Sequence, residues 1–384
     1  MTTLPISRRN WIATSLAAVA APSAVHAAAK TAGQMRAYEV GDAKDGQITM
    51  HLVKRPIPQP GPGEVLVKVH ATGLNARDLS LLRRVRIYGG AGDSTSLIPL
   101  DDNGCEVVAL GAGVTRVQKG DRVMATHFPL WVDGPWNDDM SKIDFSVNRD
   151  GFLAEYAVVG AEALVKIPDA LSYEAASTLP NPALTAWHAV VDDADVKPGE
   201  TVVTLGTGGV SIFGFQFAKF RGARVAVTSS SDEKLAKMRG LGADMTINYR
   251  NNPDWHLEVL RLTNGRGADV VLNTVGIGEM ERCINACASN GRICLIGANP
   301  VRRTGTSTEM VGLKDFPRNM IMRGLTIKGT IVGSRKMLED LTRACVDGRI
   351  APVIDRVFPF EKALDAVRYM ETGEKVGKIV IKVA

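Results

Sequence analysis

The sequence predicts an α/β protein in which a mostly β domain is combined with a doubly wound parallel sheet. Three observations support this fold class. Residues 35 to about 165 contain short β-branched strands separated by glycine and proline, which is typical of a mostly β domain. From residue 201 to 331, strands alternate with helical patterns, as in a parallel sheet whose crossover connections are helices. Where this alternation begins, residues 201–220 read as strand, glycine turn and helix.

Residues 1–29 are expected to be a targeting segment outside the folded domains. Arg8 and Arg9 lie in a twin-arginine pattern, and a mildly apolar, alanine-rich run follows at 11–21. Small residues at 25–29 offer a cleavage site. The segment therefore predicts a twin-arginine signal peptide and a periplasmic protein. The alternative is a disordered alanine-rich tail on a cytoplasmic protein.

The composition indicates a globular protein with scattered charge. The formal net charge is +5, and no basic block or aromatic-interleaved patch suggests a nucleic-acid partner. No apolar run reaches the roughly 18 residues of a membrane span. The five cysteines are odd in number and lack the spacing of a disulfide framework. Cys283 and Cys287 are expected on one face of a helix, as small apolar residues rather than as a metal pair.

The mostly β domain is expected to span 35–180 and to be completed by 350–384. Val65, Val67 and Val69 alternate with polar residues, as in a half-buried strand. Further strands are predicted at 106–108, 122–125 and 153–159. The chain ends in a strand, a helix and a strand, predicted at 356–358, 361–370 and 378–383. We expect this tail to pack back onto the mostly β domain.

The parallel-sheet domain is expected at 181–349. Its strands are predicted at 201–205, 225–228, 245–247, 270–273, 293–296 and 325–331. Helices are predicted between them, with clear patterns at 232–240, 254–262 and 278–289. Sheets of this kind bind ligands outside the carboxyl ends of their strands. The turns that follow the strands are therefore the candidate binding sites.

The turn after the first parallel strand has the composition of a dinucleotide-binding turn. Gly206 permits a tight turn, and Gly208 removes a side chain where a pyrophosphate must approach the backbone. The following helix points free N–H groups and its positive dipole end at the phosphates. A glycine-rich turn without a ligand is the alternative. The contacts expected here come from Gly206, Thr207, Gly208, Gly209 and Val210.

The end of the second parallel strand indicates which dinucleotide binds. An acidic residue at this place selects NAD, but residues 228–231 read Thr-Ser-Ser-Ser. Serines can hydrogen-bond a 2′-phosphate that a carboxylate would repel, so we expect NADP(H). Asp232 is the residue that would favour NAD instead, and Ser230 with Glu233 also fits a capping box. The expected contacts are Ser229, Ser230, Lys234 and Tyr249.

Two later turns are expected to line the path of the pyrophosphate and the nicotinamide. Both follow predicted parallel strands and therefore lie at the same edge of the sheet. Their residues are Asn273, Thr274, Val275, Ile296 and Gly297.

Several motifs together resemble the medium-chain dehydrogenase/reductase superfamily over nearly all of residues 35–384. They include residues 73–78 (GLNARD), 119–123 (KGDRV), 184–187 (LTAW), 206–211 (GTGGVS), 230–235 (SSDEKL), 353–358 (VIDRVF) and 377–380 (GKIV). The resemblance is greatest to a zinc-lacking branch that is alcohol dehydrogenase-like and quinone oxidoreductase-like. It implies a GroES-like domain split around a Rossmann domain, an active site between them, and a homodimer. It also implies that Asn75 and Thr185 lie near the nicotinamide and Lys378 near the cofactor.

The departures from the zinc-dependent members concern the metal ligands. Those members have a cysteine where Asn75 stands, a His-Glu pair in the segment of Asp101 and Asp102, and a second cysteine near Asn181. Catalytic zinc needs three protein ligands and one open position. Asparagine is a poor zinc ligand, so no metal is expected.

These expectations together predict an NADP-dependent oxidoreductase without catalytic zinc. Its substrate is expected to be a small quinone, enone or other carbonyl compound, whose oxygen is polarised by hydrogen-bond donors. The candidate catalytic residues are Asn75, Tyr88 and Thr185. His127 is a further candidate, whereas Asp78 is expected to cap a helix. An alcohol dehydrogenase acting in the oxidative direction and a non-catalytic NADPH-binding protein are the alternatives.

Overall fold

The computed structural model describes residues 33–41, 48–83, 97–297 and 315–384. All of them belong to one compact unit, Gly33–Ala384. The expected leader at 1–29 and the candidate residue Tyr88 lie outside the described residues. Within the described part, no helix combines the length and the apolar character that a membrane span requires.

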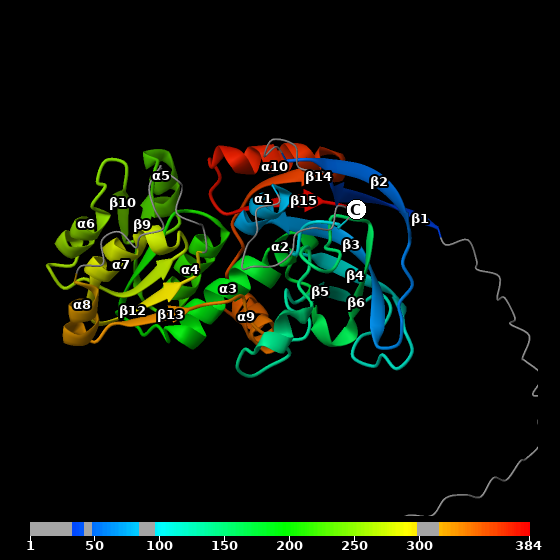
Figure 1. The fold of residues 1–384 in the computed structure, drawn as a ribbon, viewed down its shortest axis with the longest axis horizontal. Helices are drawn as coiled ribbons and strands as arrows, with labels where there is room; N and C mark the ends of the chain where they lie inside the picture. The colour runs from blue at the N-terminus through cyan, green and yellow to red at the C-terminus, as the bar shows by residue number, and fades with distance from the viewer. Residues whose placement is uncertain (1–32, 42–47, 84–96, 298–314) are drawn as a thin grey trace, which may run out of the picture. The chain divides into compact units, whose positions relative to one another are not determined.

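The first sheet has seven strands and is mostly antiparallel, in the order β14-β15-β3-β4-β5-β7, with β6 paired to β3. Strands β1 (Gln34–Val40) and β2 (Met50–Pro56) form a separate antiparallel pair. The bounds of the seven are β3 Glu64–Leu74, β4 Gly104–Leu110, β5 Arg122–Ala125, β6 Tyr156–Gly160, β7 Leu164–Lys166, β14 Ile354–Pro359 and β15 Lys378–Lys382. Strand β15 runs antiparallel to β3, with Val380 opposite Gly73. The end of the chain therefore returns to the first sheet, as the sequence predicts, and Figure 1 shows the red strand β15 beside the blue β3.

The second sheet has six parallel strands in the order β10-β9-β8-β11-β12-β13. They are β8 Thr201–Leu205, β9 Arg224–Ser229, β10 Met245–Asn248, β11 Ala268–Asn273, β12 Cys287–Leu295 and β13 Thr326–Gly329. The strand order reverses between β8 and β11. Strands β9 and β10 follow β8 on one side, and the chain then returns to place β11, β12 and β13 on its other side. The point of reversal is where open parallel sheets bind ligands.

Helices connect the parallel strands, as Figure 1 shows for α4 to α8. They are α4 Gly209–Phe220, α5 Asp232–Gly240, α6 Trp255–Leu262, α7 Met280–Ala286 and α8 Phe316–Arg323. The sheet is buried on both faces, since Val202 and Val203, which point to opposite faces, belong to separate apolar clusters. This explains why the strands read as continuous apolar runs rather than as alternating patterns.

Further helical segments lie before the parallel sheet and near the end of the chain. They include α1 Ala76–Leu82, α2 Tyr173–Ala176, η3 Leu179–Ala183, α3 Leu184–Trp187, η4 His188–Asp193, α9 Arg335–Asp347 and α10 Ala363–Thr372. Asn75 and Asp78 form the capping box of α1, so the capping role expected for Asp78 is confirmed.

Three local expectations are corrected by the structure. The helix predicted at 278–289 ends at Ala286, because β12 begins at Cys287; Cys283 and Cys287 therefore do not share a helix face. The N-cap of α5 is Ser231, whose hydroxyl accepts a hydrogen bond from the Lys234 N–H, rather than Ser230. The strand predicted at 153–159 begins at Tyr156. Each error is a boundary error of one to three residues within a correctly predicted type of element.

Candidate active site

The glycine turn lies at the point where the strand order reverses. Gly206 has φ +81°, which only glycine adopts without strain, and its N–H donates to Thr228 O at 3.0 Å. A Cβ atom placed on Gly206 or Gly208 would meet no atom within 4 Å, so the backbone is open on this side. The first N–H groups of α4 have no partner within the helix. The turn therefore fits a phosphate-bearing ligand.

Gly209 differs from the other two glycines of the turn. A Cβ atom there would lie 2.9 Å from Lys378 Cδ and 3.1 Å from Pro182 Cβ. Glycine is needed because the stem of Lys378 passes directly over the start of α4. This contact joins the expected cofactor turn to the C-terminal strand β15.

The turn after β11 contacts residues on both sides of the glycine turn, and the turn after β12 contacts the turn after β11. Thr274 Oγ1 donates to Leu205 O at 2.7 Å and lies 3.2 Å from Ser211 Oγ. Asn273 uses its side chain within its own turn, where Oδ1 accepts from the N–H groups of residues 275 and 276. A Cβ atom on Gly297 would lie 2.5 Å from Thr274, so the two turns are in close contact. Asn273 is thus a residue that shapes the turn.

At the end of β9, Ser229 is buried and Ser230 is partly exposed. Asp232 is exposed, and its Oδ1 accepts from Asn248 Nδ2 at 2.8 Å. The Lys234 ammonium donates to Gly373 O, which brings the segment after α10 against α5. The tyrosine at 249 is exposed. The Tyr249 N–H donates to Ser229 O at 3.0 Å, and the Lys234 N–H donates to the Ser231 hydroxyl, so the predicted ribose contacts are neighbours in space.

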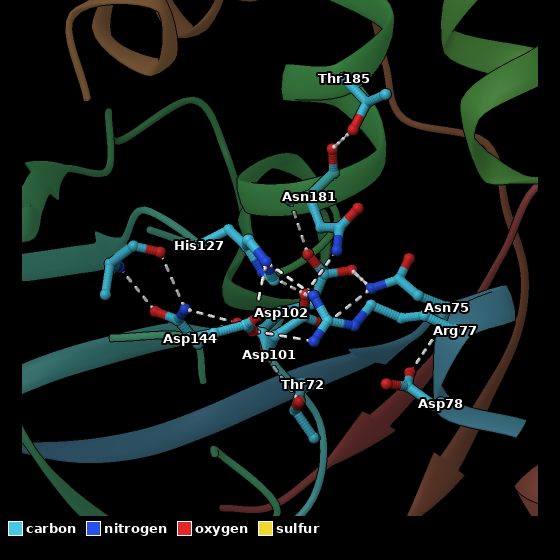
Figure 2. A network of polar contacts seen from close by, with 12 residues as sticks. Thr72, Asn75, Arg77, Asp78, Asp101, Asp102, His127, Asp144, Asn181 and Thr185 are labelled. Atoms are coloured by element: carbon cyan, nitrogen blue, oxygen red, sulfur yellow. Dashed lines mark hydrogen bonds and ion pairs between the residues drawn. The ribbon is translucent and has the colours of Figure 1, made fainter. Parts of the chain in front are cut away.

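A buried polar cluster lies beside the glycine turn at the start of α4, and Figure 2 shows its side chains pointing toward one another. The ammonium of Lys378, which is 1% exposed, donates to Leu74 O at 2.6 Å, Asn75 Oδ1 at 2.7 Å and Asp102 Oδ2 at 2.7 Å. These three acceptors use all three of its hydrogens. Lys378 is therefore fully engaged inside the protein.

The side-chain amide of Asn75 is also fully engaged. Its Nδ2 donates to Asp101 Oδ1 at 3.0 Å and to Asp102 Oδ2 at 2.9 Å, while its Oδ1 accepts from Lys378. Its backbone N–H donates to Asp78 Oδ2 at 2.6 Å. These contacts give Asn75 a positioning role in the cluster, and a direct contact with substrate stays a prediction.

The pKa values of the two adjacent aspartates of the cluster are shifted in opposite directions. Burial opposes ionisation of Asp101, but contacts with His127, Arg77 and Asn181 outweigh it and hold its pKa well below the usual range. Burial raises the pKa of Asp102 to about 6; the charge of Asp101 adds to this, and Lys378 works against it. Asp101 is therefore the permanent anion of the pair.

His127 joins the cluster to Asp144. Its Nδ1 lies 2.6 Å from Asp101 Oδ2, and its Nε2 lies 2.7 Å from Arg77 Nη1. A guanidinium can only donate, so Nε2 accepts and Nδ1 carries the proton that faces Asp101. Arg77 Nη2 also donates to Asp144 Oδ1 at 2.8 Å. Both histidine nitrogens thus lie against charged side chains of the protein.

Thr185 and Asn181 approach the cluster from α3 and the segment before it. Asn181 donates through its backbone N–H to Asp102 Oδ1 at 3.0 Å and through Nδ2 to Asp101. The Thr185 hydroxyl donates to Asn181 O at 2.7 Å, as Figure 2 shows. The structure therefore brings Asn75, Thr185 and Lys378 into one neighbourhood.

The cluster does not fit a divalent metal. Among residues 33–41, 48–83, 97–297 and 315–384, no group of three or more His, Cys, Asp or Glu side chains is arranged to hold one. The amide of Asn75 contacts both aspartates and the ammonium of Lys378 contacts Asp102, so both groups supply donors instead of lone pairs.

Sequence reasoning missed Asp144 and gave Asp101 and Asp102 only as departures from a metal-binding pattern. No local signal identifies Asp144, which lies in an irregular segment. The adjacent pair of aspartates after an apolar strand-like run was the available signal for a buried polar cluster.

Comparison with known proteins identifies the family. Residues 61–169 match the alcohol dehydrogenase GroES-like domain, and residues 241–381 match the zinc-binding dehydrogenase family. A zinc-type alcohol dehydrogenase-like protein of Schizosaccharomyces pombe is 37% identical over 350 residues, covering 90% of this chain and 99% of that protein. This chain belongs to the medium-chain dehydrogenase/reductase superfamily. It is an oxidoreductase with a GroES-like domain and a Rossmann-like parallel sheet, the fold class that the sequence predicts.

Two solved structures are similar to this medium-chain dehydrogenase/reductase. An NAD-dependent alcohol dehydrogenase is 32% identical with a TM-score of 0.79, and the match covers 91% of this chain and 100% of that one. A quinone oxidoreductase from Coxiella burnetii is 25% identical with a TM-score of 0.72, covering 92% and 100%. A nicotinamide cofactor is typical of the superfamily.

Proposed function

We propose that this protein is a zinc-independent oxidoreductase that transfers hydride between NADPH and a quinone, an enone or another carbonyl compound. The observation that supports this most strongly is the buried Lys378 ammonium, which binds Asn75 and Asp102 at the centre of the polar cluster. The ammonium supplies a positive charge at this place, where the surrounding side chains do not form a metal site. The likeness to a quinone oxidoreductase over 92% of this chain agrees with this substrate class.

The nicotinamide supplies the hydride, and the residues of this chain bind it, orient it and exclude water. The open backbone at Gly206 and Gly208 supports a bound dinucleotide at the start of α4. The substrate oxygen gains negative charge during reduction and needs a hydrogen-bond donor or a proton source. We propose Tyr88 for this role. Thr185 would lie beside the nicotinamide, and Asn75 would position the polar cluster next to it.

Replacing Tyr88 with phenylalanine tests the proton donor. We expect turnover with NADPH to fall by about 10²-fold or more, because general acids contribute that much to proton transfer. The Kd of NADPH should stay unchanged, since the substitution leaves the cofactor contacts intact. Turnover equal to the wild type on several enones and quinones would remove Tyr88 from the mechanism.

Two other functions are distinguished by simple assays. The likeness to an alcohol dehydrogenase structure favours alcohol oxidation as the second candidate function. Reduction of NADP⁺ by alcohols at high pH, without reduction of any carbonyl acceptor, would establish it. A non-catalytic protein would bind NADPH and oxidise it with no acceptor in a broad panel.

Two further proposals concern location and assembly. We propose periplasmic export through Arg8 and Arg9, which cell fractionation of the full-length chain tests.

We also propose a homodimer. Its support is that β13 forms an edge of the parallel sheet and that Ile321 and Met322 of α8 are 78% and 76% exposed. Light scattering of the purified protein measures the mass directly.

A further inference from the structure

The segment between α10 and β15 closes against both parts of the expected cofactor site. Gly377 N–H donates to Thr207 O at 3.0 Å, and Thr207 Oγ1 donates to Lys375 O at 3.4 Å. At its other end, Gly373 O accepts from the Lys234 ammonium. Lys375 therefore lies on a short span of chain that is held by the glycine turn on one side and by α5 on the other.

Among the described residues, the ammonium of Lys375 has no counter-ion, because no hydrogen bond or ion pair there engages it. Its charged neighbours are Lys378, Lys234 and Asp355, so cations outnumber the single acid. Asp355 is itself engaged, because its oxygens accept from Tyr369 Oη at 2.7 Å and from the residue 376 N–H at 3.1 Å.

The positive charge around Lys375 continues toward the end of β9. Arg250 lies near Lys234 and lowers the pKa of that lysine, after burial, which is the larger cause. Burial and the charges of Lys378 and Lys234 lower the pKa of Lys375 to about 8. Glu374 and Asp355 work against this lowering at Lys234, but the cations still outnumber these two acids, so an anion would stabilise the group.

We propose that Lys375 binds the 2′-phosphate of NADPH together with Lys234 and Ser230, and that it is a specificity-determining residue. This proposal rests on the proposed use of NADPH. The 2′-phosphate is favoured over the pyrophosphate because Lys234 is on α5, which follows the strand end where the adenosine ribose binds. The cation nearest the start of α4, Lys378, is already engaged by three acceptors.

The proposal predicts a pH dependence that only NADPH shows. Lys375 is charged below about pH 8 and loses its proton above it. The 2′-phosphate has a second pKa of about 6 and is dianionic throughout the range above pH 7. NADPH should therefore bind more weakly at pH 9 than at pH 7, while NADH binding stays constant. The charged groups that face Lys375 are Lys234, Lys378 and Asp355, and burial lowers the pKa of Lys234 as well.

The test compares four probes by calorimetry on the full-length protein: NADPH, NADH, 2′,5′-ADP and ADP. Lys375→Met should weaken NADPH and 2′,5′-ADP by about tenfold or more, as expected for loss of a charge-assisted contact to phosphate. NADH and ADP should change by less than about twofold, within ordinary scatter. Lys375→Arg should restore most of the affinity, and Lys237→Met, which removes an exposed cation of α5, should have no effect. Thermal unfolding of each variant checks that the fold is intact.

The outcomes separate this inference from the proposed function. If the wild type prefers NADPH and Lys375→Met keeps the same ratio of NADPH to NADH affinity, the role of Lys375 is wrong while the cofactor proposal stands. If Lys375→Met weakens all four probes equally, Lys375 holds the pyrophosphate and the specificity role is overturned. If the wild type itself shows no preference for NADPH, both proposals fail.

Discussion

Replacing Lys378 with methionine is expected to lower the free energy of unfolding by about 3–5 kcal/mol at pH 8, the usual cost of removing one partner of a buried ion pair. The ammonium is 1% exposed and contacts Leu74 O, Asn75 Oδ1 and Asp102 Oδ2 within 2.7 Å. Without it, the Asp102 carboxylate and two carbonyl-type oxygens stay buried and uncompensated. Urea denaturation of the purified variant measures the loss.

The loss should depend on pH in a defined direction. The pKa of Asp102 is already about 6, raised by burial, and removal of the neighbouring cation raises it further. At pH 5 the variant therefore holds Asp102 neutral, and the destabilisation should be smaller than at pH 8. Lys382→Met is the matched control, because this lysine lies on the same strand, is exposed, and pairs only weakly with Glu174 at 3.7 Å. The control should stay within about 0.5 kcal/mol of the wild type. A Lys378 variant that is as stable as the control would contradict the account of the cluster.

Replacing Gly208 with alanine is expected to weaken dinucleotide binding by about tenfold or more, which corresponds to about 1.4 kcal/mol or more. The backbone at Gly208 has φ −76° and ψ 179°, which alanine adopts without strain. A Cβ atom there meets no protein atom within 4 Å and instead projects into the open space that the pyrophosphate must enter. The Kd of NADPH and of NADH should rise together, because both carry the pyrophosphate.

The same substitution should leave the fold nearly unchanged. Alanine is a poorer N-cap than glycine, so a loss below about 1 kcal/mol is expected. Gly240→Ala is the control: a Cβ atom there also meets nothing within 4 Å, and the residue lies in the last turn of α5. It should leave binding unchanged and raise the free energy of unfolding by at most about 1 kcal/mol, because alanine is the better helix former. Unchanged affinity of the Gly208 variant for both dinucleotides would show that the turn is not the binding site.

The local elements of this fold could be predicted where pattern and boundary residues agree. Strands β5 and β8 and helix α5 occupy the predicted residues, because each has a clear period and a turn residue at its ends. The helix before β12 was predicted too long, since Cys287 and its neighbours fit a helix as well as a strand until pairing with β11 decides. The predicted N-cap of α5 differs from the observed one by one residue, because three serines in succession offer equivalent hydroxyls.

The polar cluster could be predicted only in part. The resemblance placed Asn75 and Lys378 near the cofactor, but their mutual hydrogen bond joins residues 303 positions apart in sequence. His127 and Asp144 approach Asp101 and Arg77 from loops whose paths depend on the whole first sheet. Such contacts have no period or spacing, so the sequence offers candidates without their partners. The leader and Tyr88 stay predictions, because they lie outside the described residues.

The central claim is that hydride transfer here depends on a buried ammonium and a dinucleotide, without catalytic zinc. The most direct measurement combines zinc quantification with turnover of NADPH by an enone or quinone, before and after dialysis against a chelator. The account predicts substoichiometric zinc and the same turnover in both samples, because the cluster offers donors where a metal needs ligands. One zinc ion per chain, with turnover that is lost on chelation and restored by zinc alone, would contradict it.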